Sequence, residues 1–167
     1  MCKCNNIYKY SESGLNHECG VLGIYGVPDA ANLAYYGLHA LQHRGQQGCG
    51  IVSVDSQGEF HRFKGDGLVT EVFNEDKISK LQGSMAIGHV RYSNAKCKGT
   101  ENIQPFLFHH NSGDFAMANN GQIANYVQLR NELEDRGSLF QSSSDAEVIA
   151  HLIKKQGTDK TLPRIYS

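Results

Sequence analysis

Cys19 is the residue of this sequence best placed to act as a nucleophile. It directly precedes GVLGIYG, a run typical of a buried strand, and it follows eighteen polar, irregular residues. If those eighteen residues were removed, Cys19 would carry both its thiol and a free α-amine. An α-amine titrates near pH ~8 and can accept the thiol proton without a separate histidine. Free cysteines are also commonly buried in strands, so Cys19 alone leaves both interpretations open.

Four further segments place polar groups beside strand-like runs, and together they fit an amino-acid substrate that carries an amide. They are HRGQ at 43–46, GHVRYSN at 88–94, NNGQ at 119–122 and SSSD at 142–145. The Arg91 guanidinium suits a carboxylate, and the Asp145 carboxylate suits an ammonium group. The side-chain N–H of Asn120 and the backbone N–H of Gly121 would form an oxyanion hole. Taken singly, each could be a surface charge, a turn or a helix cap.

The elements that must position these groups are strand pairs followed by two helices. We expect strands over 20–25, 51–54, 59–64, 85–91, 106–109 and 115–119, and helices over 29–42, 126–136 and from 144 to about 157. Short helical pieces are expected over 68–81 and a long loop over 92–104. Asn120-Gly121 is a turn signal, and Ser144 and Glu147 have the spacing of a capping box. This order favours a layered α+β domain.

Length, charge and cysteine content exclude several classes of function. The 167 residues suit one domain, and the net charge of −1 offers no basic patch for nucleic acid. No apolar run approaches the ~18 residues of a membrane-spanning helix, and the first residues lack the apolar core of a secretory signal. Five cysteines make no disulfide framework, which favours the cytoplasm. Cys2, Cys4 and His17 are too few ligands for zinc, so no metal is expected.

Residues 14–155 resemble the glutamine-hydrolysing domain of class II amidotransferases, which are N-terminal-nucleophile hydrolases. The segments that carry the resemblance are GLNHECGVLGIYG, YYGLHALQHRGQQGCGIV, GLVTEVF, IGHVRYSN, ENIQPFLF and SSSDAEVIAHLIK. LQHRGQ and the leader before the cysteine are most similar to the amidophosphoribosyltransferase family. The resemblance implies glutamine hydrolysis that supplies ammonia for phosphoribosylamine synthesis from phosphoribosyl pyrophosphate, the first step of de novo purine synthesis. It also implies a four-layer αββα fold.

The resemblance assigns roles to seven residues: the nucleophile, the two oxyanion donors, two groups that hold glutamine, and a loop beside the nucleophile. Cys19 would be the nucleophile, and Asn120 and Gly121 would be the oxyanion donors. Arg91 and Asp145 would hold glutamine, and Arg44 and Gly45 belong to the loop beside the nucleophile. Arg91 would grip the α-carboxylate and Asp145 the α-amino group, and we assign the loop to substrate binding as well. The chain departs from the family pattern at Asn94, Asn119, Gln122 and Cys49, which leaves these roles filled.

The chain stops at LPRIYS, where the family's domain continues with further strands and then with a phosphoribosyltransferase domain. We therefore expect a leader at 1–18 and an incomplete amidotransferase domain at 19–167, with weak or no turnover by itself. Magnesium and an iron–sulfur cluster would belong to the absent part, so no cofactor is expected in this chain. The resemblance implies a homo-oligomer for the full-length family.

Two other interpretations remain open. The chain could be a truncated, non-catalytic remnant, or another N-terminal-nucleophile amide hydrolase without a synthase partner. The pair of Arg91 and Asp145 argues against the second, because such a pair suits a free amino acid.

Overall fold

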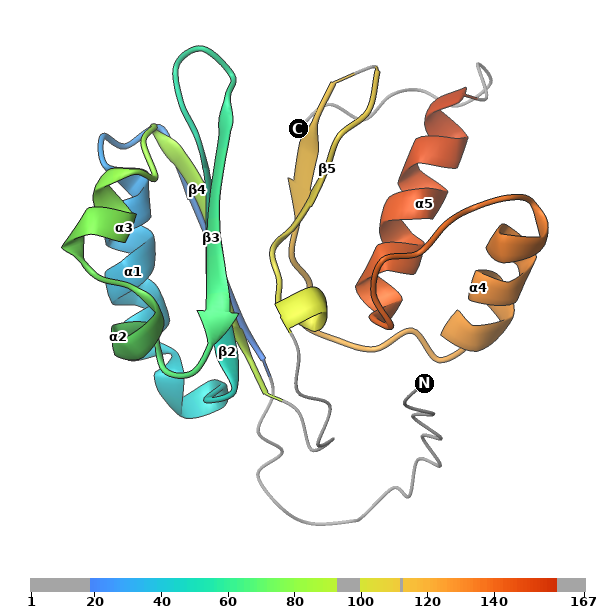
Figure 1. Ribbon diagram of the computed structural model, residues 1–167, viewed down its shortest axis with the longest axis horizontal. Coiled ribbons are helices and arrows are strands. Elements are labelled where there is room, and N and C mark those ends of the chain that lie inside the picture. Colours follow the sequence, from blue (N-terminus) through green and yellow to red (C-terminus); the bar gives the residue numbers. More distant parts are fainter. Residues whose placement is uncertain (1–18, 93–99, 112, 159–167) are drawn as a thin grey trace. The chain divides into compact units, whose positions relative to one another are not determined.

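The computed structural model describes residues 19–92, 100–111 and 113–158, with side chains described up to residue 154. The chain divides into two compact units, Met1–Asn120 and Gly121–Ser167, and each is described by itself. The first unit holds β1 Gly20–Tyr25, α1 Ala30–Ala40, η1 Gln42–Arg44, β2 Gly48–Val54, β3 Phe60–Asp66, α2 Val69–Val72, α3 Glu75–Ser79, β4 Met85–Arg91, η2 Thr100–Asn102, β5 Phe106–Phe108 and β6 Phe115–Met117 (Figure 1). The second unit holds α4 Tyr126–Asp135 and α5 Asp145–Thr158.

The first unit is built on a four-stranded antiparallel sheet. The strand order is β1-β4-β2-β3, so the first strand of the chain pairs with the last of the four. Gly20 of β1 and Cys49 of β2 both lie opposite Val90 of β4, one on each side. The sheet therefore brings the start of β1 beside the end of β4, which are far apart in the sequence.

Helices α1, α2 and α3 cover one face of this sheet (Figure 1). Small residues on α1 allow it to lie close to the strands, because a short side chain leaves room for the facing backbone. The buried alanines of α1 are Ala30, Ala31 and Ala34. Leu38 is fully buried, and a Cβ added to Gly88 of β4 would lie only 3.0 Å from its side chain. The main apolar core lies between these helices and β2 and β4.

The opposite face of the sheet contacts the segment that leads into β5. A Cβ on Gly50 would lie 2.5 Å from the carbonyl oxygen of Gln104, and one on Gly48 would lie 2.7 Å from Ile103 Cδ1. These two glycines of β2 therefore allow a close approach that any larger residue would prevent. Beyond this segment, β5 and β6 pair antiparallel as a short second sheet.

The second unit is a pair of helices joined by a loop, and side chains of the same unit hold this loop in place. Arg130 of α4 donates from Nη1 to the carbonyl oxygen of Ser142 at 2.8 Å, and its Cζ lies 4.2 Å from the centroid of the Phe140 ring. Phe140 in turn contacts the ring of His151 on α5, with 4.4 Å between centroids. These contacts fix the segment that leads into α5.

The observed elements confirm the predicted strands and helices, with shifts at several of their ends. α1 ends at Ala40 rather than at residue 42, and β3 continues to Asp66 rather than to residue 64. β2 begins at Gly48 rather than at residue 51, because its glycines pair with strands on both sides. β6 ends at Met117 rather than at residue 119. Gly121 lies in a bend that continues toward α4, in keeping with the turn signal at Asn120-Gly121. The predicted leader at 1–18 lies outside the described residues.

Candidate active site

Cys19 lies at the start of β1 and contacts the backbone just beyond β4. Its Sγ accepts a hydrogen bond from the N–H of Tyr92 at 3.3 Å and lies 3.5 Å from the carbonyl oxygen of the same residue. The thiol is partly exposed. Because Tyr92 directly follows Arg91, the sheet places the predicted nucleophile beside the strand that carries the predicted carboxylate-binding arginine.

The loop that follows η1 packs against the same strand end. A Cβ on Gly45 would lie 2.7 Å from the backbone carbon of Arg91, so only glycine allows this approach. Gln47 donates its N–H to the carbonyl oxygen of Arg91 at 3.2 Å. The structure thus brings the loop of Arg44 and Gly45 next to Arg91 and, through Tyr92, to Cys19.

Gln42 holds this loop in place, a role that the sequence alone does not indicate. Its Oε1 accepts the N–H of Val69 at 2.6 Å, and its Nε2 donates to the carbonyl oxygen of Gly45. One side chain therefore joins the loop beside the nucleophile to the start of α2. The LQHRGQ motif contains this glutamine, but its partner is 27 residues away, so the motif alone could not indicate the contact.

The two predicted oxyanion donors fall on either side of the boundary between the units. Asn120 ends the first unit and is exposed, whereas Gly121 begins the second. Gly121 has a φ of 150°, a backbone angle that favours glycine. Asn119, directly before Asn120, makes two hydrogen bonds with the side chain of Gln104.

Asp145 begins α5 in the second unit. Its Oδ2 accepts the N–H of Ile123 at 2.7 Å, which ties the start of the helix to the segment just after Gly121. A carboxylate can accept further hydrogen bonds, so this contact leaves capacity for an ammonium group. Asp145 is thus linked to the segment that follows Gly121, and both residues belong to the second unit.

The predicted capping box at Ser144 and Glu147 is only partly correct. Ser144 Oγ accepts the N–H of Ala146 at 3.3 Å, as a capping residue should. The carboxylate of Glu147, however, reaches further back, to the N–H groups of Gln141 and Ser142 at 2.8 and 2.7 Å. It also accepts the hydroxyl of Ser142, so this buried acid organises the SSSD loop instead of closing the box.

Cys49 is not a rival nucleophile. Its thiol is fully buried, and burial, with a smaller effect of the Glu71 charge, raises its pKa to about 12. A thiol with such a pKa is almost entirely protonated at neutral pH, and the thiolate is the reactive form.

His89 is a buried titratable group that precedes Arg91 on β4. His89 is 1% exposed, and neither ring nitrogen makes a hydrogen bond of normal geometry within the described residues, although the backbone of Asn119 lies close to the ring. Burial, and secondarily the positive charge of Arg91, lower the pKa of His89 from 6.5 to about 4. The imidazole is therefore neutral in the folded protein at physiological pH.

We expect His89 to make the fold sensitive to acid. In the unfolded state the His89 imidazole binds a proton below about pH 6.5, whereas in the folded state it does so only near pH 4. The free energy of unfolding therefore falls as the pH drops through this window, by roughly 3 kcal/mol in total. Urea unfolding at about pH 7 and about pH 4.5 measures the loss. His89→Gln should flatten this part of the profile. An equal loss of stability with pH in the variant and the unmodified protein would contradict the assignment.

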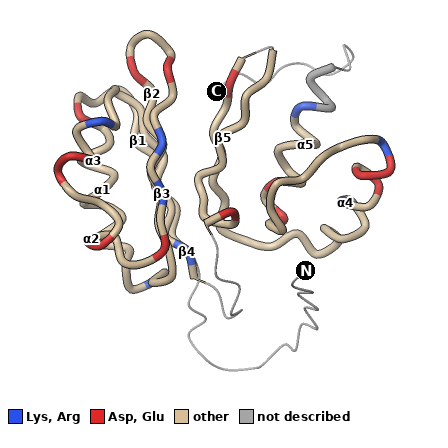
Figure 2. The backbone as a smooth tube through the Cα atoms, viewed as in Figure 1, with Lys and Arg blue, Asp and Glu red and all other residues tan. Residues whose placement is uncertain are grey.

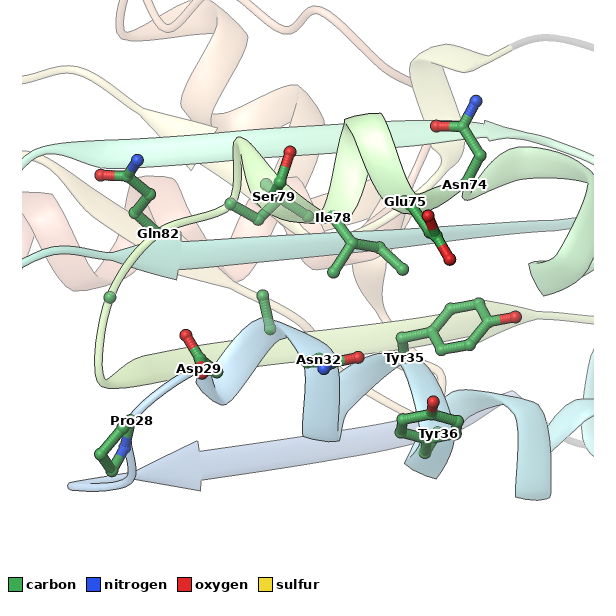
Figure 3. A pocket seen from close by; sticks show the side chains of 13 residues that line it. Pro28, Asp29, Asn32, Tyr35, Tyr36, Asn74, Glu75, Ile78, Ser79 and Gln82 are labelled. Carbon is green, nitrogen blue, oxygen red and sulfur yellow. The ribbon is translucent and has the colours of Figure 1, made fainter.

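A cleft of about 990 Å³ lies elsewhere, between α1 and α3. Figure 3 shows Glu75 and Ile78 of α3 facing Asn32 and Tyr35 of α1 across it. The lining comes from residues 28–36 and 74–83, so none of the predicted site residues contributes to it. The segments around Pro28 and Gly83 adjoin the end of β1 and the start of β4, opposite to the strand ends at Cys19 and Tyr92. We assign the chemistry to the Cys19 end.

The charged residues that the structure describes are spread over both units rather than gathered in one place. Figure 2 shows lysine, arginine, aspartate and glutamate dispersed along the backbone of both units. Within the described part of the chain, no three histidine, cysteine, aspartate or glutamate side chains gather as metal ligands would. In the same part, no helix combines the length and apolar character that a membrane span requires.

Comparison with protein families and known proteins gives consistent matches. A family model described as a glutamine amidotransferase domain matches residues 75–166. Amidophosphoribosyltransferase of Bacillus subtilis is 54% identical over 145 residues, which cover 86% of this chain and 30% of that protein. The enzyme of the same name from Lacticaseibacillus casei is 50% identical over 148 residues, 88% of this chain and 76% of the relative. This chain thus spans about a third of the length of several relatives.

Solved structures match the fold as well. Glutamine phosphoribosylpyrophosphate amidotransferase from B. subtilis, complexed with ADP and GMP, aligns with a TM-score of 0.75 at 48% identity, covering 88% of this chain and 30% of that one. A structure described as the allosteric regulatory enzyme of purine biosynthesis aligns with a TM-score of 0.78 at 49% identity, with the same coverage. These matches confirm the α+β amidotransferase fold that the sequence predicts.

Proposed function

The chain belongs to the amidophosphoribosyltransferase family, of which it carries the glutamine amidotransferase domain, and we propose that it hydrolyses glutamine at Cys19. The observation that carries this proposal is the contact of the Cys19 thiol with the backbone of Tyr92, the residue that directly follows Arg91. The ammonia would react with phosphoribosyl pyrophosphate, the substrate named for the related B. subtilis structure, to give phosphoribosylamine. Because weak or no turnover is expected of residues 19–167 by themselves, each activity measurement uses the chain extended to the full length of its relatives. An assay of glutamate and ammonia release in equal amounts tests the first step.

The reaction needs a free α-amine on Cys19. We propose that the peptide bond between Glu18 and Cys19 is cleaved, since Cys19 begins the first strand of the sheet. The amine then takes the thiol proton, and the thiolate forms a bond to the amide carbon of glutamine. The Asn120 side chain and the Gly121 N–H stabilise the oxyanion. Collapse breaks the C–N bond, and the proton held by the α-amine leaves with the ammonia.

The second half of the reaction restores the enzyme. A γ-glutamyl thioester remains on Cys19, and water attacks it with the α-amine again acting as the base. Glutamate is released and the thiol is regenerated. This cycle uses only groups of the chain itself, so we propose that it requires no metal or cofactor. We further propose a cytoplasmic location, supported by the odd number of cysteines, and a homo-oligomeric full-length enzyme.

Arg91 and Asp145 should act mainly in binding glutamine. Arg91→Ala and Asp145→Ala remove one partner of a charge pair with the substrate, a change that costs on the order of 2–5 kcal/mol where the pair is desolvated. We therefore expect KM for glutamine to rise at least about 30-fold in each variant. Arg91→Lys keeps the charge but loses the planar fork, so its KM should also rise clearly.

The control for this experiment is Glu134→Ala, which removes a partly exposed carboxylate whose partner is Arg130 within α4. Its KM should equal that of the unmodified protein. Asp145 could instead be only a cap of α5, in which case Asp145→Ala would lower stability by about 1 kcal/mol and leave KM unchanged. Unchanged KM in both alanine variants would refute the assignment of these two residues.

A further inference from the structure

Gln104 holds the residue that precedes the predicted oxyanion donor. Its side chain is 7% exposed and makes two hydrogen bonds to one residue, Asn119. The Asn119 N–H donates to Gln104 Oε1 at 2.7 Å, and Gln104 Nε2 donates to Asn119 Oδ1 at 3.2 Å. Both the backbone and the side chain of Asn119 are therefore fixed by a single buried amide.

The register of the second sheet explains why a side chain is used here. Phe106 of β5 lies opposite Met117 of β6, so two residues further along Gln104 lies opposite Asn119. The strands end before this point, and Pro105 has no N–H to continue the ladder. The side-chain amide of Gln104 takes the place of a backbone hydrogen-bond partner, so the pairing between the two strands of the hairpin continues to Asn119.

Gln104 is itself bound firmly to the sheet that carries the nucleophile. Its carbonyl oxygen lies so close to Gly50 of β2 that an added Cβ would approach it to 2.5 Å. The preceding residue, Ile103, is fully buried, and its carbonyl oxygen accepts a hydrogen bond from Lys64 Nζ on β3 at 2.9 Å. The segment thus contacts β2 and β3 on one side and holds Asn119 on the other.

We propose that Gln104 is a positioning residue for the oxyanion hole, which sets the place of Asn120 relative to the sheet that carries Cys19. The proposal rests on the proposed function, because it matters only if Asn120 donates to an oxyanion formed at Cys19. A donor must lie within about half an ångström of its productive position, and an error of 1 Å can cost about 100-fold in rate. Asn120 is exposed, and its backbone is joined directly to Asn119, which Gln104 holds through two hydrogen bonds.

Gln104→Met tests the proposal, because methionine fills the same buried space without either hydrogen bond. We expect kcat for glutamine hydrolysis to fall about 10- to 100-fold, with KM changed less than about 2-fold. Asn119→Ala keeps the backbone bond to Gln104 Oε1 and should show a smaller loss. Ser53→Ala is the control. The Ser53 hydroxyl is fully buried, like the Gln104 amide, but it lies on β2, on the face of the sheet that packs against the helices. Its removal should leave kcat unchanged.

A reversible inhibitor reports on the oxyanion hole without turnover. The aldehyde analogue of glutamine forms a thiohemiacetal, in which Cys19 Sγ bonds to the aldehyde carbon and the carbonyl oxygen occupies the oxyanion site. Its affinity should weaken in Gln104→Met by the same factor as kcat. Alkylation of Cys19 by iodoacetamide uses no oxyanion donor, so its rate should stay that of the unmodified protein. A purely structural role for Gln104 would change both reactions or neither.

Hydrogen exchange separates failure of this proposal from failure of the proposed function. The Asn119 amide should exchange faster in Gln104→Met than in the unmodified protein, whatever the activity. If Asn119 exchanges faster but aldehyde affinity and kcat are unchanged, or if exchange itself is unchanged, the positioning role is wrong. If the unmodified protein forms no thiohemiacetal at Cys19, the proposed function is wrong and the positioning role falls with it.

Discussion

Cys19→Ala is expected to abolish glutamine hydrolysis, with kcat lowered by about 10⁴-fold or more. In this account the thiol forms the only covalent bond to the substrate, and no other described group can replace it. Loss of the nucleophile in covalent enzymes costs on the order of 10⁶ in kcat. Measurement of glutamate release against glutamine concentration gives the value, and circular dichroism checks that the variant is folded.

Cys49→Ala is the matched control for this prediction. Its thiol is fully buried, and its pKa of about 12 leaves it protonated, so hydrolysis should continue at close to the original rate. A glutamine-like chloroketone should label the unmodified protein and Cys49→Ala, but not Cys19→Ala. Persistent labelling of Cys19→Ala, or turnover that remains in it, would assign the chemistry to another residue.

Asn120→Ala is expected to lower kcat about 100- to 1000-fold with little change in KM, the second-largest effect. The side-chain N–H of Asn120 stabilises charge that exists only after Cys19 attacks, so its loss affects the transition state rather than glutamine binding. Asn120→Asp should be at least as harmful, because it replaces a donor with a negative charge beside the oxyanion.

Asn125→Ala provides the comparison for Asn120. Asn125 is an exposed asparagine just before α4, and its side chain makes no capping hydrogen bond. Its removal should leave both kcat and KM unchanged. A kcat for Asn120→Ala within about 3-fold of the unmodified protein would exclude Asn120 from the oxyanion hole.

Local patterns predict the parts of this fold whose causes are local. The apolar runs after Cys19 and before Arg91 are predicted as buried strands, and both appear as strands, β1 and β4. Only β4 is largely buried, because β1 lies at the edge of the sheet and exposes Val21 and Tyr25. The start of β2 was missed because Gly48 and Gly50 resemble a loop in sequence. Both positions require glycine because residues 103–104, from a distant part of the chain, pack closely against them. No local sequence pattern indicates this contact.

The same distinction separates the predicted site residues from those that position them. Cys19, Arg91 and Asp145 have side-chain types that indicate chemistry on their own. Gln42 and Gln104 are amides that could lie anywhere on a surface, and only their contacts reveal a role. The contact between Cys19 and Tyr92 joins residues 73 positions apart, so it too required the fold.

During turnover, Cys19 should carry the γ-glutamyl group as the first residue of the mature protein. Mass spectrometry of the full chain, quenched in acid after brief mixing with glutamine and then digested, tests it directly. We expect a peptide whose N-terminus is Cys19 and which bears one γ-glutamyl group, lost on treatment with hydroxylamine. A γ-glutamyl group on any other residue, or one on Cys19 in a chain that still carries residues 1–18, would contradict the account.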